Sequence, residues 1–290
     1  MDIGRPLNDA LSWARFVPYR LAGRLRRLTT PISPNPDAAV SVAIRYSVLF
    51  AHGRGWRLAD GRSPEAYRAA LFAPERLAER LTLFAGVVLP SLAAQTLPMR
   101  KGVREVVLLV SAEMPADGLA RLRAAIAAFD WIRLAAVPPD AAGIPMTGPD
   151  TIFASVRLDD DDALARGFMA RISGYVRPEY AGRVITFPSG ISAFLDQHLR
   201  YARFANRWTA KETMGMSYIA GPGTPFGSVY HLGHHGKVHR AAPLLSDPQG
   251  PMYLRTIYAG QDSLALARTR PGAPVSRQEV EQHFALSSRL

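Results

Sequence analysis

The stretch Ile152–Asp162, IFASVRLDDDD, carries an apolar segment into four consecutive aspartates. β-Branched and aromatic residues between Ile152 and Val156 indicate a buried strand, and apolar residues over 163–170 return at helical spacing. The pattern predicts that the acids lie on a strand-to-helix turn. Asp162 is then the expected N-cap of the helix.

Neighbouring carboxylates repel one another, so this turn needs compensating positive charge. Side chains alternate along an extended chain, which would place Asp159 and Asp161 on one side and Asp160 on the other. An Asp-x-Asp pair at the carboxyl end of a strand suits Mg²⁺ or a similar hard cation held together with substrate phosphates. The alternative is a solvated acidic turn that stabilises the positive end of a helix.

On either side of this stretch, the periodicity of apolar residues predicts an α/β fold, with a Rossmann-like mixed, mostly parallel sheet flanked by helices. We expect a site at the carboxyl ends of the strands. The expected strands are 39–49, 106–110, 131–135, 183–187 and 191–195, and a turn at Pro188 joins the last two. The expected helices are 74–89, 119–129 and 164–175. The rest of the chain is expected to be irregular. The expected organisation is a basic N-terminal arm and Pro-rich linker over 1–38, one domain over 39–270 and a C-terminal tail over 271–290.

Composition restricts the environment and the partners. The chain of 290 residues has a formal net charge of +11 and no cysteine, which excludes disulfides and thiolate metal sites. Only three of the 35 basic residues are lysines, and we interpret this arginine bias as compositional drift in a GC-rich genome. Because no compact basic block follows residue 30, we do not expect nucleic acid as a partner.

Membrane insertion is not expected either. The N-terminus lacks the uninterrupted apolar core of a secretory signal. Leu81–Met99 is free of charge but is interrupted by Pro90 and Pro98, so it predicts a buried helix rather than a span. The basic amphipathic stretch over 1–30 leaves two alternatives open: docking on the domain, or peripheral contact with an anionic membrane at its inner face. We expect a cytoplasmic location.

Several short segments occur in a characteristic order: Arg45-Tyr46-Ser47, Leu89-Pro-Ser-Leu-Ala-Ala-Gln-Thr96, Ser111, and Arg157-Leu-Asp-Asp-Asp-Asp-Ala-Leu164. With them the chain resembles nucleotide-sugar glycosyltransferases of the GT-A fold, and among these the bacterial family named putative rhamnosyl transferases. In that family a Pro-Ser-Leu-x-x-Gln-Thr-like motif ends a helix between the first two strands, and an Arg-Leu-Asp-x-Asp-Asp-Ala motif ends a central strand. The resemblance covers residues 40–260 and does not account for the histidine-rich loop over 230–239.

The resemblance implies a GT-A-like enzyme that transfers a sugar, rhamnose by the family's name, from a nucleotide-sugar donor to a glycan or lipid-linked acceptor, with inversion. It also implies Mg²⁺ or Mn²⁺ bridging the donor phosphates. By matching positions, Asp161 is the implied direct metal ligand, and Asp159 contacts ribose or a metal-bound water. The implied donor-binding residues are Arg45, Ser111, Arg157, Asp159 and Asp160.

Two roles remain to be assigned. His234, on a Gly-flanked loop, is a candidate to complete the metal site, although a histidine is more commonly a hydrogen-bonded surface residue. An inverting transfer needs a carboxylate base, for which Glu212 and Asp196 are the candidates and Asp262 a third. Two rival functions stay open: a polyanion-binding protein with steeply salt-dependent binding, and a metal-dependent phosphohydrolase that uses the same aspartates.

Overall fold

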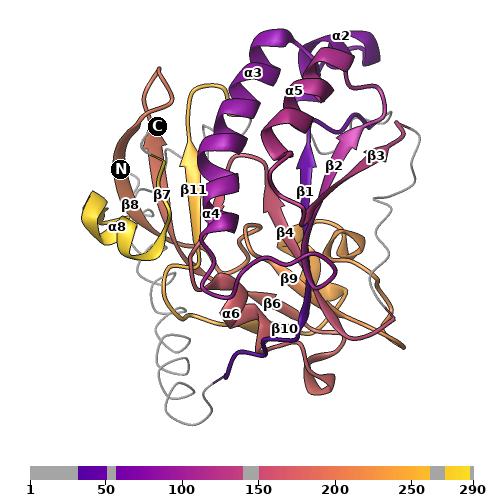
Figure 1. Ribbon diagram of the computed structural model, residues 1–290, viewed down its shortest axis with the longest axis vertical. Helices are drawn as coiled ribbons and strands as arrows, with labels where there is room; N and C mark the ends of the chain where they lie inside the picture. Colours follow the sequence, from indigo (N-terminus) through magenta and orange to yellow (C-terminus); the bar gives the residue numbers. More distant parts are fainter. Residues whose placement is uncertain (1–31, 51–56, 140–149, 262–271, 288–290) are drawn as a thin grey trace, which may run out of the picture.

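The computed structural model describes residues 32–50, 57–139, 150–261 and 272–287, which form a mixed α/β structure (Figure 1). In the larger sheet, of seven described strands, the order is β10-β6-β9-β4-β1-β2-β3, and four of the six neighbouring pairs are parallel. The predicted mostly parallel sheet is thereby confirmed. Its strands are β1 (Ala39–Tyr46), β2 (Arg104–Ser111), β3 (Ile132–Val137), β4 (Phe153–Asp159), β6 (Val184–Thr186), β9 (Ser217–Ala220) and β10 (Leu244–Ser246).

A second sheet, of five described strands, has the order β12-β8-β7-β11-β5 and is mostly antiparallel. Its strands are β5 (Ala163–Leu164), β7 (Ser189–Leu195), β8 (Tyr201–Trp208), β11 (Tyr253–Ile257) and β12 (Pro274–Val275). The prediction of irregular structure after residue 195 is therefore wrong. The strands predicted over 183–187 and 191–195 correspond to β6 and β7, which belong to different sheets.

One long helix lies between the two sets of strands in the view of Figure 1 and contributes to the core that they share. It consists of α3 (Pro74–Leu83), a π-helical turn η2 (Phe84–Val88) and α4 (Leu89–Ala93). The wide turn lies just before Pro90, whose nitrogen cannot donate to the carbonyl of Gly86, and there the amide of Leu89 donates to Phe84. The predicted buried helix is confirmed and extends past Pro90. Within the described residues, no helix is long and apolar enough to cross a membrane.

The remaining helices pack around the sheets. They are α2 (Pro64–Leu71), α5 (Ala116–Ile126), α6 (Phe168–Ser173) and α8 (Arg277–His283), with shorter turns at Arg57–Ala59, Pro178–Tyr180, Val229–Leu232 (η4) and His235–Arg240 (η5). Of these, α5 and α6 contribute buried residues to the main core. In the segment predicted as a C-terminal tail, α8 begins with a capping box of Ser276 and Glu279. Val280 and Phe284 of this segment belong to the main core. The predicted N-terminal arm over 1–31 lies outside the described residues.

The aspartates lie on a turn between two strands, so the predicted strand-to-helix turn is wrong. Asp159 ends β4, and Ala163 and Leu164 pair antiparallel with β11 in the second sheet. The next helix begins only at Phe168, with Gly167 as its N-cap. Asp162 caps no helix, and its Oδ1 instead accepts the amide of Thr256 at 2.9 Å. Pairing with a buried strand has overridden the helical spacing of this short apolar segment.

Candidate active site

Two predicted residues meet at the carboxyl ends of neighbouring parallel strands. Arg45 of β1 and Asp159 of β4 are register partners, so they lie side by side at this edge of the sheet. Arg157 precedes Asp159 by two residues and therefore points to the same side of β4. Its Nη2 lies 3.3 Å from Oδ1 of Asp159. The parallel register thus gathers two cations and one carboxylate at one edge.

Tyr230, on η4, joins this group from far along the chain. The Arg45 guanidinium carbon lies 4.9 Å from the centre of the Tyr230 ring, and that of Arg157 lies 5.5 Å from it. The Tyr230 hydroxyl donates to the carbonyl of Ala43 at 3.3 Å, which holds the ring against β1. We call Arg45, Arg157, Asp159 and Tyr230 the strand-end cluster.

Within the strand-end cluster, Asp159 and Arg157 stay ionised. Burial alone would raise the pKa of Asp159, but Arg157, Arg45 and Arg255 more than offset this and hold it below its ordinary value. Burial likewise lowers the pKa of Arg157, and the neighbouring Asp159 and Tyr230 reverse that shift. The Asp159 side chain is 32% exposed, so its carboxylate is both ionised and accessible.

Glu212, a predicted base, lies within electrostatic reach of the cluster, because its charge also acts on Arg157. Its Oε2 accepts a hydrogen bond from Nε of Arg207 at 2.8 Å, and its Oε1 accepts one from the amide of Thr213 at 3.0 Å. Arg255 approaches Oε1 to 3.9 Å. The Glu212 carboxylate is therefore surrounded by donors, with its side chain only 5% exposed.

The other predicted residues lie elsewhere. Ser111 ends β2, and its Oγ accepts the amide of Glu113 at 3.1 Å. Asp196 follows β7, where its Oδ1 accepts the amides of His198 and Arg200. The hydrogen bond from Arg200 lowers the pKa of Asp196. In the described structure these hydrogen bonds stabilise local turns, whereas Asp262 lies outside the described residues.

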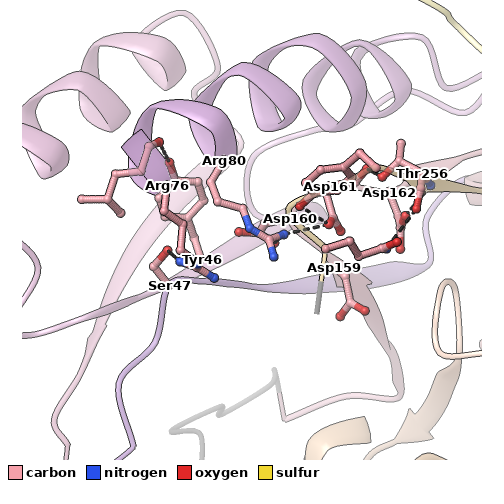
Figure 2. Close-up of polar contacts among 12 residues, drawn as sticks. Tyr46, Ser47, Arg76, Arg80, Asp159, Asp160, Asp161, Asp162 and Thr256 are labelled. Atoms are coloured by element: carbon pink, nitrogen blue, oxygen red, sulfur yellow. Dashed lines mark hydrogen bonds and ion pairs between the residues drawn. The ribbon is translucent and has the colours of Figure 1, made fainter. Parts of the chain in front are cut away.

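The aspartates after β4 take different partners, as Figure 2 shows. Nη1 of Arg80, on α3, donates to Oδ1 of Asp160 at 2.9 Å and to Oδ2 of Asp161 at 2.7 Å. Asp159 points away from this guanidinium (Figure 2). The predicted alternation, which grouped Asp159 with Asp161, is therefore wrong. The extended backbone ends at Asp159, so alternation no longer applies to the residues of the turn.

Two residues of the β11 region complete this buried turn. The Tyr258 hydroxyl donates to Oδ2 of Asp161 at 3.0 Å, and the Thr256 hydroxyl donates to the Asp161 carbonyl at 2.7 Å. Burial, followed by the charge of Asp161, raises the pKa of Tyr258, so its hydroxyl stays protonated and able to donate. Burial also raises the pKa of Asp160 to about 6, although Arg80 opposes the shift.

A divalent ion held by Asp161, Asp159 and His234 does not fit these contacts. Oδ2 of Asp161 already accepts from Arg80 and Tyr258, and Nδ1 of the exposed His234 accepts the amide of Gly236 at 3.1 Å. Across the described residues, no three His, Cys, Asp or Glu side chains are grouped so as to hold a metal ion. His235, stacked 4.4 Å from His234, is the loop histidine whose pKa is lowered by burial and by Arg157.

Comparison with known proteins identifies a matching protein family. A sequence model of the family described as "putative rhamnosyl transferase" matches residues 40–270, which is most of the chain. The chain belongs to this family. Membership supports a glycosyltransferase, and no curated protein matches the chain. Among solved structures, a putative glucose-1-phosphate thymidylyltransferase from Bacillus anthracis, in complex with sucrose, aligns over 83% of this chain and 98% of its own. At 9% identity and a TM-score of 0.30, that likeness carries no argument.

Some residues of this family member were not found from its sequence. Tyr230 begins the histidine-rich loop over 230–239, which stood out for its histidines and not for this tyrosine. Arg207 and Arg255 lie in the part of the chain predicted to be irregular, and neither was given a role. Arg80 did have a detectable signal: it shares the apolar face of its helix with the buried Leu77 and Leu83. A charge on an apolar helical face indicates a buried partner of opposite charge.

Proposed function

We propose that the chain is a GT-A-type glycosyltransferase that binds a nucleoside diphosphate sugar at the strand-end cluster and transfers the sugar to a glycan or lipid-linked acceptor. Rhamnose is the sugar that the family's description suggests. The observation that carries the proposal is the convergence of Arg45 and Arg157 on Tyr230, beside the ionised Asp159, at the carboxyl edge of a mostly parallel sheet.

Each member of the cluster has chemistry that suits such a donor. Guanidinium groups bind phosphate through charge-assisted hydrogen bonds and stack on planar rings. In this proposal Arg45 and Arg157 meet the diphosphate, and Asp159 accepts hydrogen bonds from the ribose hydroxyls. Tyr230 holds the two guanidinium groups in place and offers an aromatic surface to the nucleoside.

The transfer step that we propose inverts the sugar and requires a base for the acceptor hydroxyl. Of the two predicted bases that the structure describes, Glu212 lies within electrostatic reach of the strand-end cluster, whereas Asp196 lies in a surface turn. We therefore propose Glu212 as the base. Its ion pairs with Arg207 and Arg255 would have to loosen as the acceptor binds.

The resemblance implies metal dependence, whereas the contacts of Asp161 and His234 do not favour a metal ion held by these residues. The phosphohydrolase alternative requires carboxylates that are open to a metal ion, and the contacts of Asp160 and Asp161 with Arg80 disfavour it. Peripheral membrane contact stays a prediction about residues 1–30, which are not described.

The test is calorimetric titration of UDP, GDP and TDP into the full chain and into Arg157→Ala. We expect one nucleotide to bind the native chain, and Arg157→Ala to weaken it about tenfold or more, because a charge-assisted hydrogen bond is worth about 1.5–3 kcal/mol. Arg121→Ala is the matched control, since Arg121 forms an exposed ion pair with Asp117 on α5. Absence of binding by every nucleotide, or equal binding by Arg157→Ala, would contradict the proposal.

A further inference from the structure

Arg80 occupies the position between two carboxylates that a bridging cation would take. A single nitrogen, Nη1, lies within 3 Å of Oδ1 of Asp160 and Oδ2 of Asp161. The three side chains are 9%, 10% and 6% exposed, so the contact is almost closed to water. Within this enclosure Arg80 supplies positive charge to the crowded carboxylates.

The surrounding structure fixes Arg80 in this place. It extends from the buried face of α3, and its guanidinium carbon lies 5.9 Å from the centre of the Tyr258 ring. The Tyr258 hydroxyl completes the shell of Oδ2 of Asp161. A metal ion would have to displace both donors from Asp161, and breaking a buried ion pair of the guanidinium in this way is strongly unfavourable.

The strand-end cluster and the residues around Glu212 carry their own surplus of positive charge. The charged side chains that act on one another there include four arginines and three carboxyl groups: Arg45, Arg157, Arg207, Arg255, Asp159, Asp162 and Glu212. The arginines outnumber the carboxyl groups, and burial raises the pKa of Asp162, which favours its neutral form. An anionic diphosphate placed here would meet guanidinium groups able to neutralise it, which is the role that a divalent ion would otherwise have.

We propose that Arg80 takes the place of a divalent cation in the aspartate turn, and that the donor diphosphate is bound by arginine side chains without a metal ion. The first half of this proposal, the role of Arg80, concerns the turn alone. The second half, donor binding without a metal ion, rests on the proposed function.

Two titrations of the native chain test these halves separately. In the first, free Mn²⁺ is followed by electron paramagnetic resonance as protein is added, and we expect no saturable binding. In the second, the nucleoside diphosphate titration is run with Mn²⁺ and with EDTA, and we expect the two dissociation constants to agree within about twofold. Saturable Mn²⁺ binding would overturn the first half, and nucleotide binding that is lost in EDTA would overturn the second. If no nucleotide binds under either condition, the proposed function itself is wrong, and the second half with it.

A variant provides a positive test of the turn. Arg80→Met removes the guanidinium and leaves Asp160 and Asp161 open to a metal ion, so Mn²⁺ should raise the melting temperature of this variant by a few degrees. The native chain and the control Arg121→Met should not respond. A folded Arg80→Met protein that is indifferent to Mn²⁺ would contradict the inference. If the variant does not fold, the Mn²⁺ titration of the native chain decides.

Discussion

Asp160 shows how burial and charge pairing compete at a single residue. Its carboxylate accepts from Arg80 at 2.9 Å, which favours the ionised form, yet burial favours the protonated form more strongly. Asp161 and Asp159 add repulsion. The pKa of Asp160 therefore rises from 3.8 to about 6, and the folded state binds a proton more tightly than the unfolded chain does.

The consequence is a stability contribution that depends on pH. The contribution is fully present below the unfolded pKa of 3.8 and is lost as the pH rises through about 6. Asp160→Asn cannot ionise, so we expect the native chain to lose up to about 3 kcal/mol relative to this variant between about pH 4 and pH 7. Urea unfolding of both proteins across this range measures the difference. A difference that does not change with pH would contradict the raised pKa.

At the scale of elements, the pairing of β7 with β11 depends on a residue without a side chain. Gly190 lies opposite Tyr253 in the parallel register, and a Cβ atom at position 190 would overlap the Tyr253 ring. That ring is fully buried, and its hydroxyl donates to the carbonyl of Pro188 at 3.4 Å. The ring therefore has little room to move away.

Gly190→Ala should accordingly destabilise the second sheet. We expect a loss of about 1–3 kcal/mol in the free energy of unfolding, the usual cost of overpacking a well-packed core. Gly167→Ala is the control for added volume, because no atom lies within 4 Å of a Cβ atom added there. Gly167 is the N-cap of α6, where alanine is less favourable than glycine, so we expect a cost below about 1 kcal/mol. Equal stability of the two variants in urea would show that Tyr253 can move aside.

At the scale of the whole molecule, the end of the chain closes the core. Val280 and Phe284 are fully buried in the same core as residues of both sheets and of the long helix. The other side chains of α8 are exposed to solvent, and a capping box of its own starts the helix. The helix α8 and Phe284 are thus structural parts of the fold.

Phe284→Ala should therefore destabilise the entire molecule and not only its end. Truncating a buried phenylalanine removes its hydrophobic contribution and leaves a cavity, at a cost of about 3–5 kcal/mol. The measurement is urea unfolding followed by far-ultraviolet circular dichroism and tryptophan fluorescence, whose transitions should shift together. Gln282→Ala, at an exposed position two residues before Phe284, should change stability by less than about 0.5 kcal/mol. An unchanged unfolding midpoint for Phe284→Ala would contradict this role.

By itself the sequence determined the elements whose signals are local. Apolar runs of strand length predicted β1, β2 and β4, and apolar residues at helical spacing predicted the long helix. Residues adjacent to strand ends were predicted with them, because parallel strands bring their carboxyl ends to one edge of a sheet. Arg45, Arg157 and Asp159 were named as donor-binding residues by the family resemblance, and the parallel register of β1 and β4 places Arg45 beside Asp159.

The tertiary structure alone decided which distant groups meet. Arg80 and Asp160 are 80 residues apart, and nothing local to the aspartates indicates that a guanidinium satisfies them. The same holds for Ala163 and Leu164, whose helical spacing lost to pairing with β11. Short strands and buried charges depend on partners remote in sequence, because their free energy comes from burial and pairing and not from local propensity.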